Sequence, residues 1–182
     1  DKLNRYLLSD KSMFKIKVTE SKVLPKVKLA QPKPFHDYRG EMWTFWEEEY
    51  DLLPPNKKFK ISKFTRSRKN VLRGLHYQIN PYAQAKFVEC LVGKVYDVVV
   101  DLRKNSATFL NWGGIELSEE NHKQIWIPEG FAHGFYTLTD KAHLIYKVNN
   151  FWNKDSERTI IWNDSCLEIN WPQLKSEPIL SD

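Results

Sequence analysis

The chain is poor in cysteine, in glycine and in long apolar runs. Its 182 residues include only 2 cysteines and 7 glycines. Cys90 and Cys166 do not form a CxxC pair, so they indicate neither a zinc site nor a disulfide framework, and we expect a reducing compartment. No apolar run approaches the roughly 18 residues that a membrane-spanning helix needs, and residues 1–12 lack the organisation of a signal peptide. We therefore expect a cytoplasmic protein without a membrane segment.

Helical periodicity and concentrated charge are also scarce. The acidic stretch 45–53, which stops before Pro54 and Pro55, is the candidate for a short helix. The net charge is +5, but Glu and Asp interrupt the lysine-bearing stretches, whereas a nucleic-acid-binding surface needs a concentrated basic stripe. The excess charge suits an anionic ligand such as a phosphate, or simply a solubilising surface. Nucleic acid is not an expected partner.

Aromatic residues and short alternating segments are abundant. The 7 Trp, 8 Tyr and 10 Phe suit half-buried pleated surfaces, and also pockets that stack rings or sugars. Many short strands separated by turn signals predict one all-β domain, a sandwich or barrel, over residues 13–182. Residues 1–12 are interpreted as an extension or a cloning remnant outside that domain. The expected strands are 13–18, 86–92, 95–102, 112–117, 124–127, 135–138, 143–148 and 160–162.

Residues 65–80 combine several basic side chains with a small apolar island. Arg66, Arg68, Lys69 and Arg73 surround residues 71–72. Basic residues beside a strand are what a diphosphate site needs. An exposed edge strand that charge keeps soluble has the same appearance, so both interpretations stay open.

Two of the five histidines stand at strand–turn junctions among glycines. They are His76 and His133, for which functional and structural roles are about equally favoured. His36, His122 and His143 lie in polar or alternating contexts typical of surface or structural histidines.

The spacing Pro-x-Gly-x-x-His at residues 128–133 is one of the two signatures of cupin barrels. In metal-binding cupins the other signature carries His-x-His, but here residues 76–78 read His-Tyr-Gln. Two histidines are too few for zinc or iron, which take three or four protein ligands. We therefore expect neither a metal nor another cofactor.

Three longer motifs make the resemblance specific. Residues 70–78, 95–104 and 126–135 resemble the dTDP-4-dehydrorhamnose 3,5-epimerase family, and the similarity extends from about residue 14 to 182. The resemblance implies a cupin-type jelly-roll β-barrel with an N-terminal arm and few short helices, assembled as a homodimer. It also implies a metal-independent epimerase that inverts C3 and C5 of a nucleotide-linked 4-keto-6-deoxy sugar, with rhamnose for a surface polysaccharide as the family-level product.

The resemblance assigns roles that fit the chemistry. His76 would be the general base, Tyr146 the general acid on the opposite face, and Lys86 a cation near the ketone oxygen. A histidine that is neutral near pH 7 can remove a proton beside a carbonyl, and a fixed cation stabilises the enolate that forms. Asp97 would support an active-site group. The expected substrate-binding residues are Arg73, His133, Glu157, Arg39, Gln78, Phe151 and Trp152.

Each assignment has a structural alternative. The alternative for Tyr146 is packing within its strand, with its hydroxyl bonded to the backbone, and the alternative for Lys86 is a solvated position on its strand. Asp97 and Asp101 share one face of a strand, so a salt bridge at the rim explains them as well as a supporting role does.

The chain departs from the family where the family recognises its nucleotide. Thr44 stands in place of a Glu, residues 61–63 replace a Gln-Asp-Asn stretch, and Phe151-Trp152 replaces two tyrosines. Mismatched buried hydrogen-bonding groups are costly, so a GDP-linked 4-keto-6-deoxy-heptose is an alternative substrate. A single-centre epimerase, a 3,4-ketoisomerase and a non-catalytic sugar-nucleotide-binding cupin also stay open. The family's acidic partner of the histidine is expected at or just beyond Asp182.

Overall fold

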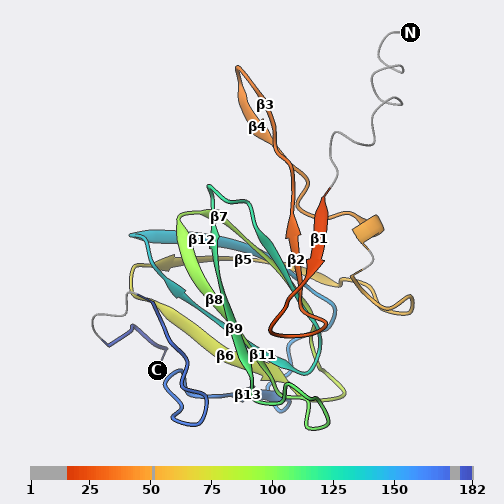
Figure 1. Ribbon diagram of the computed structural model, residues 1–182, viewed down its shortest axis with the longest axis vertical. Helices are drawn as coiled ribbons and strands as arrows, with labels where there is room; N and C mark the ends of the chain where they lie inside the picture. The colour runs from red at the N-terminus through yellow and green to blue at the C-terminus, as the bar shows by residue number, and fades with distance from the viewer. Residues whose placement is uncertain (1–15, 51, 173–176, 182) are drawn as a thin grey trace.

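Two antiparallel sheets face each other in the computed structural model, which describes residues 16–50, 52–172 and 177–181 (Figure 1). The six-stranded sheet has the order β1 (Lys17–Glu20), β2 (Lys28–Gln31), β10 (Gln124–Ile127), β7 (Lys86–Val92), β12 (Lys141–Val148), β5 (Ile61–Arg68). The five-stranded sheet has the order β13 (Glu157–Thr159), β6 (Leu72–Gln78), β11 (Phe131–Thr137), β8 (Lys94–Asp101), β9 (Trp112–Ser118). This confirms the all-β jelly roll. The two sheets share no paired strands, so the jelly roll is a sandwich of two sheets whose edges stay open.

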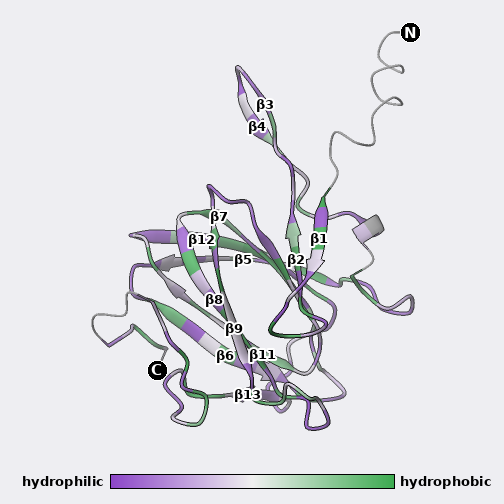
Figure 2. Cartoon of the chain, viewed as in Figure 1, coloured by the Kyte–Doolittle hydropathy of each residue, from purple (hydrophilic) through white to green (hydrophobic). Residues whose placement is uncertain are grey.

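Period-two alternation buries both faces of the central strands. Along β11, Phe131 and Phe135 point between the sheets, whereas Ala132 and Tyr136 point to the outer face of the five-stranded sheet. Mixed hydropathy within single strands, for example along β6, is visible in Figure 2. The core between the sheets includes Val88, Val95, Val99, Leu117, Ile125, Ile127 and Leu144.

Segments outside the sheets cover their outer faces. Leu167 and Trp171, near the C-terminal end, pack on the five-stranded sheet. On the six-stranded sheet, Tyr50 and Leu52 pack with the fully buried Phe87. The helix expected at 45–53 is reduced to a single 3-10 turn, Glu48–Tyr50, because aromatic contacts with the sheet override the local helical tendency.

Most of the expected strands are present. The strands at 86–92 and 124–127 are confirmed to the residue, and those at 95–102, 112–117 and 143–148 shift by at most two residues at either end. The strand expected at 135–138 begins earlier, at Phe131. That at 13–18 lies mostly outside the described residues, and β1 starts at Lys17. The strand expected at 160–162 is wrong, because β13 ends at Thr159 and only Ile160 still exchanges backbone hydrogen bonds, with Leu75. Strands β2, β3, β4, β5 and β6 were not among the expected strands, although one interpretation of the segment 65–80 was an exposed edge strand.

The basic segment 65–80 divides between two strands with different surroundings. β5 is an edge strand, and its Arg66 and Arg68 side chains are exposed on the outer face, as the charged-edge interpretation predicts. β6 lies inside the other sheet and carries Arg73. Among the described residues, no helix is long and apolar enough to cross a membrane.

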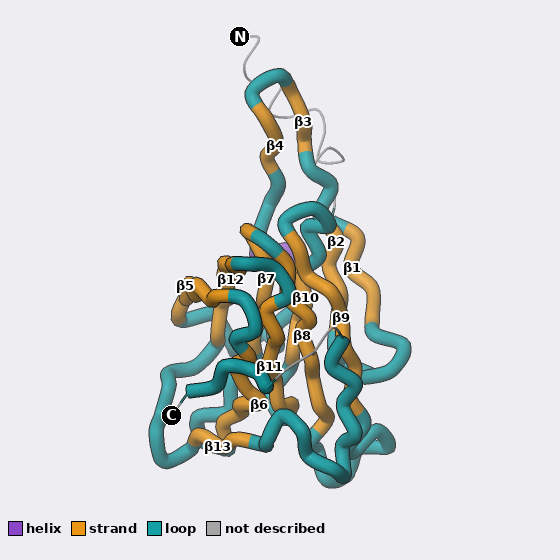
Figure 3. The backbone as a smooth tube through the Cα atoms, turned by 90° about the vertical axis from the view of Figure 1, so that its left-hand side faces the viewer, coloured by secondary structure: helices purple, strands orange, loops and turns teal. Residues whose placement is uncertain are grey.

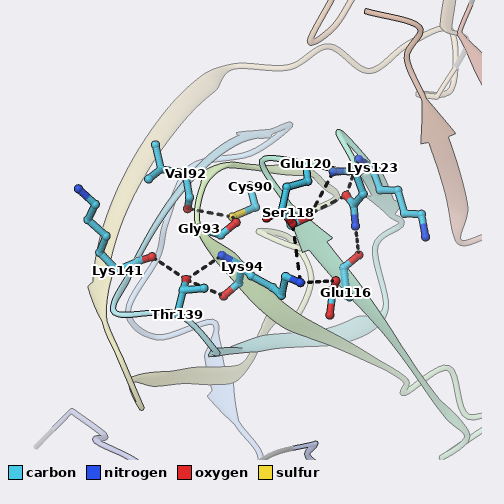
Figure 4. Close-up of polar contacts among 11 residues, drawn as sticks. Cys90, Val92, Gly93, Lys94, Glu116, Ser118, Glu120, Lys123, Thr139 and Lys141 are labelled. Atoms are coloured by element: carbon cyan, nitrogen blue, oxygen red, sulfur yellow. Dashed lines mark hydrogen bonds and ion pairs between the residues drawn. The ribbon is translucent and has the colours of Figure 1, made fainter.

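Gly93 makes the tight turn between β7 and β8 (Figure 4). Its φ is +73°, and a Cβ there would lie 2.1 Å from the carbonyl oxygen of Lys141. Thr139 fastens the turn, since its hydroxyl accepts a hydrogen bond from the Lys94 amide at 2.9 Å and donates one to the Lys141 carbonyl at 2.8 Å. Only glycine combines this φ with so close an approach.

A hairpin extends away from the sandwich. Strands β3 (Phe35–Asp37) and β4 (Gly40–Met42) pair only with each other, and both views show the hairpin standing clear of the two sheets (Figures 1 and 3). Tyr38 at its turn is 97% exposed and Met42 is 58% exposed. This hairpin is the arm that the family resemblance implies.

Candidate active site

A cavity of about 900 Å³ opens between the two sheets. Its polar lining comes from both sheets, and the chain from Thr159 to Trp162 and from Ile179 to Ser181 closes one side. The lining side chains that can exchange protons or form hydrogen bonds with a ligand are Arg73, His76, Lys86, His133, Tyr146 and Thr159.

His76 lies on β6, between two strands that both contribute to its surroundings. Its Cα partners are His133 on β11 and Thr159 on β13, and its Nδ1 lies 3.2 Å from the Thr159 hydroxyl oxygen. Burial lowers the pKa of His76 below 6.5, and the nearby Lys86 charge lowers it further, while Glu157 opposes the shift. The imidazole is therefore neutral near pH 7, which is the state that a general base requires.

Two glycines allow β6 and β11 to approach closely beside His76. A Cβ on Gly74, whose φ is +118°, would lie 2.6 Å from the Gly134 Cα, and one on Gly134 would lie 2.6 Å from the Arg73 carbonyl oxygen. The pairing register of β11 and β6 shifts between His133 and Phe135. Such irregularities re-aim side chains, and this one lies within the cavity wall.

Tyr146 and Lys86 lie on the opposite wall, on β12 and β7 of the six-stranded sheet. Burial raises the pKa of Tyr146 above 10, with the Arg73 charge opposing, so its hydroxyl keeps its proton at neutral pH. Burial lowers the pKa of Lys86 from 10.5 to about 8, against the opposing charges of Asp97 and Glu157. The Lys86 ammonium lies 3.4 Å from the His76 carbonyl oxygen, at the base of the cavity. Tyr146 therefore offers a proton and Lys86 a positive charge.

The buried Asp97 on β8 contacts the second histidine. Its Oδ2 lies 2.8 Å from Nε2 of His133, and both residues are buried. Asp101 lies four residues further along, at the end of the same strand. It instead accepts hydrogen bonds from Arg103, Ser106 and Thr108. The supporting role expected for this strand face thus fits Asp97, which contacts a residue of the cavity wall. The salt bridge expected at the rim is made by Asp101.

Arg73 on β6 lines the cavity, whereas Glu157 on β13 does not line it. Arg73 is exposed and donates from Nε to the Ser67 hydroxyl at 3.0 Å. Glu157 is half-buried, and its charge raises the pKa values of both His76 and Lys86. Arg73 can therefore reach a ligand in the cavity, and Glu157 acts on the cavity through its charge.

Besides Glu157, four expected substrate-binding residues do not line this cavity. Gln78 is buried, and its amide is bonded to the backbone of Tyr82, Phe151 and Asn153, because it anchors the loop after β12. Phe151 and Trp152 in that loop are each 55% exposed. Arg39 lies on the protruding hairpin, bonded to Asp37.

The remaining histidines lie outside the cavity. His36 is on the hairpin near Glu41, at 3.5 Å. His122 is buried against the Trp43 ring and lies 3.4 Å from Glu41. His143 meets the Phe64 ring.

The sequence reasoning missed Thr159, whereas the 179–181 segment in the lining directly precedes Asp182, where an acidic partner of His76 was expected. Thr159 lies 83 positions from His76 along the chain, so only strand pairing reveals their contact. Asp182, the candidate acidic partner of His76, lies outside the described residues. No group of three or more His, Cys, Asp or Glu side chains suited to a metal ion occurs in the part of the chain that the structure describes.

Comparison with known proteins identifies the family. The family model described as dTDP-4-dehydrorhamnose 3,5-epimerase matches residues 21–182. The dTDP-4-dehydrorhamnose 3,5-epimerase of Shigella flexneri is 49% identical over 161 residues, covering 87% of this chain and 88% of the relative.

Solved structures agree with this match. The dTDP-6-deoxy-D-glucose-3,5-epimerase of Legionella pneumophila, in complex with dTDP-4-keto-L-rhamnose, superposes with a TM-score of 0.86 at 40% identity, over 92% of this chain and 88% of the other. A 3′-monoepimerase from Streptomyces bikiniensis, in complex with dTDP-quinovose, gives 0.82 at 29% identity, over 90% and 83% of the two chains. From sequence and fold alike, the chain belongs to the dTDP-4-dehydrorhamnose 3,5-epimerase family.

Proposed function

We propose that this protein is an isomerase that inverts C3 and C5 of a nucleotide-linked 4-keto-6-deoxy sugar, with His76 as base and Tyr146 as acid. The observation that carries the proposal is the placement of these two side chains on opposite sheets, with one cavity between them. Inversion requires a proton to leave one face of a carbon and to return to the other.

His76 removes the proton beside the ketone. Its lowered pKa keeps the ring neutral, and the Thr159 hydroxyl oxygen can accept a hydrogen bond from a protonated Nδ1. Nε2 is then the atom with a free lone pair, directed at the substrate. The electrons of the broken C–H bond move into the carbonyl and form an enolate.

Lys86 stabilises the enolate oxygen, and Tyr146 completes the inversion. A fixed cation acts most strongly where little water screens it, and the lowered pKa of Lys86 reflects that surrounding. The Tyr146 hydroxyl delivers a proton to the opposite face as the enolate collapses back to the ketone. Proton exchange with solvent then restores both side chains.

The nucleotide is best taken as dTDP. The Shigella relative is named for a dTDP sugar, and the Legionella neighbour was solved with one. The departures at Thr44, at residues 61–63 and at Phe151-Trp152 keep a GDP-linked 4-keto-6-deoxy-heptose as the second candidate. The catalytic roles are the same for both.

The protruding hairpin supports a homodimer. Its Arg39 lies away from the cavity of its own chain, so it can bind substrate only in a second subunit. Free Cys90 and Cys166 fit a reducing compartment, and we place the reaction in the cytoplasm.

Deuterium wash-in from D₂O tests the activity, with dTDP- and GDP-linked 4-keto-6-deoxy sugars supplied separately. Label at both C3 and C5 supports the 3,5-epimerase, and the substrate that is labelled identifies the base. Label at one carbon indicates a single-centre epimerase, and a shifted carbonyl indicates a ketoisomerase. Binding without any label indicates a sugar-nucleotide-binding protein and contradicts catalysis.

Two variants test the residue roles. His76→Ala and Tyr146→Phe should retain binding and lose at least a hundredfold in turnover. His143→Ala is the matched control, because this half-buried histidine lies outside the cavity lining. Turnover at the wild-type rate in either active-site variant contradicts the assignment.

A further inference from the structure

The strands of the protruding hairpin bury little apolar surface within their own chain. Their large apolar side chains and that of the turn are exposed, namely Phe35, Tyr38 and Met42. A cavity of about 610 Å³ lies at the base of the hairpin, and Glu41, Trp43 and His122 are among the residues that line it. The angle at which the hairpin leaves the sandwich therefore depends on polar contacts at its base.

Trp43, the first residue after β4, contacts two residues of the sandwich. Its indole N–H donates a hydrogen bond to Oε1 of Glu89 on β7 at 2.5 Å. Its ring lies against the ring of His122, with centroids 4.3 Å apart. The Nε2 atom of His122 lies 3.4 Å from Oε2 of Glu41 on β4. These contacts join the last strand of the hairpin, and the residue that follows it, to the sandwich.

Glu89 lies at the centre of these contacts. Its side chain is fully buried, and both of its carboxylate oxygens accept hydrogen bonds. The Nε2 atom of Gln124 on β10 donates to Oε2 of Glu89 at 2.8 Å and to the carbonyl oxygen of Thr44 at 3.2 Å. A buried carboxylate is stable only where donors surround it. Glu89 therefore holds Trp43 directly and the backbone of Thr44 through Gln124.

We propose that Glu89 is a positioning residue, which sets the direction in which the hairpin carries Arg39 to the substrate of a second subunit. Arg39 lies four residues before Trp43, or about 13 Å along an extended strand. A tilt of about 10° at the base of the hairpin would move Arg39 by about 2 Å, which is enough to break a charge-assisted hydrogen bond. The proposal rests on the proposed function, since it assumes that Arg39 binds substrate in a second subunit.

Steady-state kinetics of Glu89→Leu and Glu89→Gln at pH 7 test the proposal. The substrate is whichever of the dTDP- and GDP-linked 4-keto-6-deoxy sugars the wild-type protein turns over. We expect Glu89→Leu to raise KM about tenfold, as for the loss of one hydrogen bond to a charged group. Its kcat should fall less than threefold, since His76 and Tyr146 are untouched. Glu89→Gln keeps an oxygen that can accept from Trp43, so its KM should stay within threefold of wild type.

A double variant separates positioning through Arg39 from a general effect on the fold. Arg39→Gln alone should raise KM about tenfold. Adding Glu89→Leu to Arg39→Gln should raise KM by less than a further twofold, because the second change then has nothing left to misplace.

Two single variants complete the set. Trp43→Phe removes the indole N–H, keeps an aromatic ring beside His122 and should raise KM at least threefold. Glu116→Leu is the matched control, because it makes the same substitution at an exposed position on β9 of the other sheet, and it should leave KM unchanged. Thermal unfolding of each variant shows whether the fold is intact.

Three results overturn this inference and leave the proposed function standing. An unchanged KM in Glu89→Leu means that the hairpin is directed without Glu89. A further tenfold rise in the double variant means that Glu89 acts independently of Arg39. An equal rise in Glu116→Leu reduces the effect to net charge. An unchanged KM in Arg39→Gln removes Arg39 from the substrate site, and a wild-type protein that labels neither sugar refutes the proposed function itself; either result removes this inference as well.

Discussion

Replacing Lys86 by Met should make the protein more stable while it removes most of the activity. Burial lowers the pKa of Lys86 from 10.5 to about 8. Each pKa unit corresponds to about 1.4 kcal/mol, so keeping this ammonium charged in the folded state costs up to about 3 kcal/mol below pH 8. Met keeps a similar length and apolar stem without the charge. We expect the free energy of unfolding at pH 7 to rise by about 1–3 kcal/mol.

The stability advantage of Lys86→Met over wild type should decrease as the pH rises. Between pH 8 and 10.5 the unfolded wild-type chain binds more protons at Lys86 than the folded chain does, so wild-type stability gains with rising pH from this residue. The advantage of Lys86→Met should therefore shrink by more than half between pH 7 and 9.5. Turnover should meanwhile fall by about a hundredfold or more, because the enolate loses its cation.

Urea unfolding at pH 7 and at pH 9.5, together with the deuterium wash-in rate, measures both effects. Lys141→Met is the control, because this exposed lysine on β12 should change the free energy of unfolding by less than about 0.5 kcal/mol. The reasoning is refuted if Lys86→Met is less stable than wild type at pH 7, or if its advantage does not depend on pH.

Two further predictions concern buried residues within the sheets, Glu89 on β7 and Gly134 on β11. Burial raises the pKa of Glu89 from 4.5 to about 7, against hydrogen bonds from Gln124 and Trp43, so its contribution to stability is complete below pH 4.5 and is lost as pH rises through 7. Urea unfolding should show Glu89→Gln more stable than wild type by about 1–3 kcal/mol at pH 8 and equal to it near pH 4.5; a gap that is constant with pH would contradict this. Gly134→Ala should lower stability by about 1–3 kcal/mol in thermal unfolding, because its Cβ meets the backbone of β6. Gly113→Ala, whose nearest neighbour is a Leu24 methyl at 3.4 Å, should change stability by less than half as much, and equal losses in the two variants would refute the steric argument.

The sequence by itself determined the class of fold and most of the strands. Strands such as β7 and β10 could be predicted because alternation and β-branched residues report burial locally. The short strands β2, β3 and β4 escaped, since three or four residues carry too little pattern to be read. The longer β5 and β6 escaped because basic and small residues interrupt the alternation of apolar residues along them. The acidic stretch 45–53 was misread as a helix because its aromatic residues pack on the sheet, which local propensity does not register.

For the site, motifs in the sequence pointed to His76, Lys86, Tyr146, Arg73 and His133, and the structure brings all five to one cavity. Only the tertiary structure decided which groups surround them. The contacts of His76 with Thr159 and of Asp97 with His133 join residues 83 and 36 positions apart. The physical reason is that strand pairing and sheet packing, which set these neighbours, depend on contacts between distant segments that no local pattern encodes.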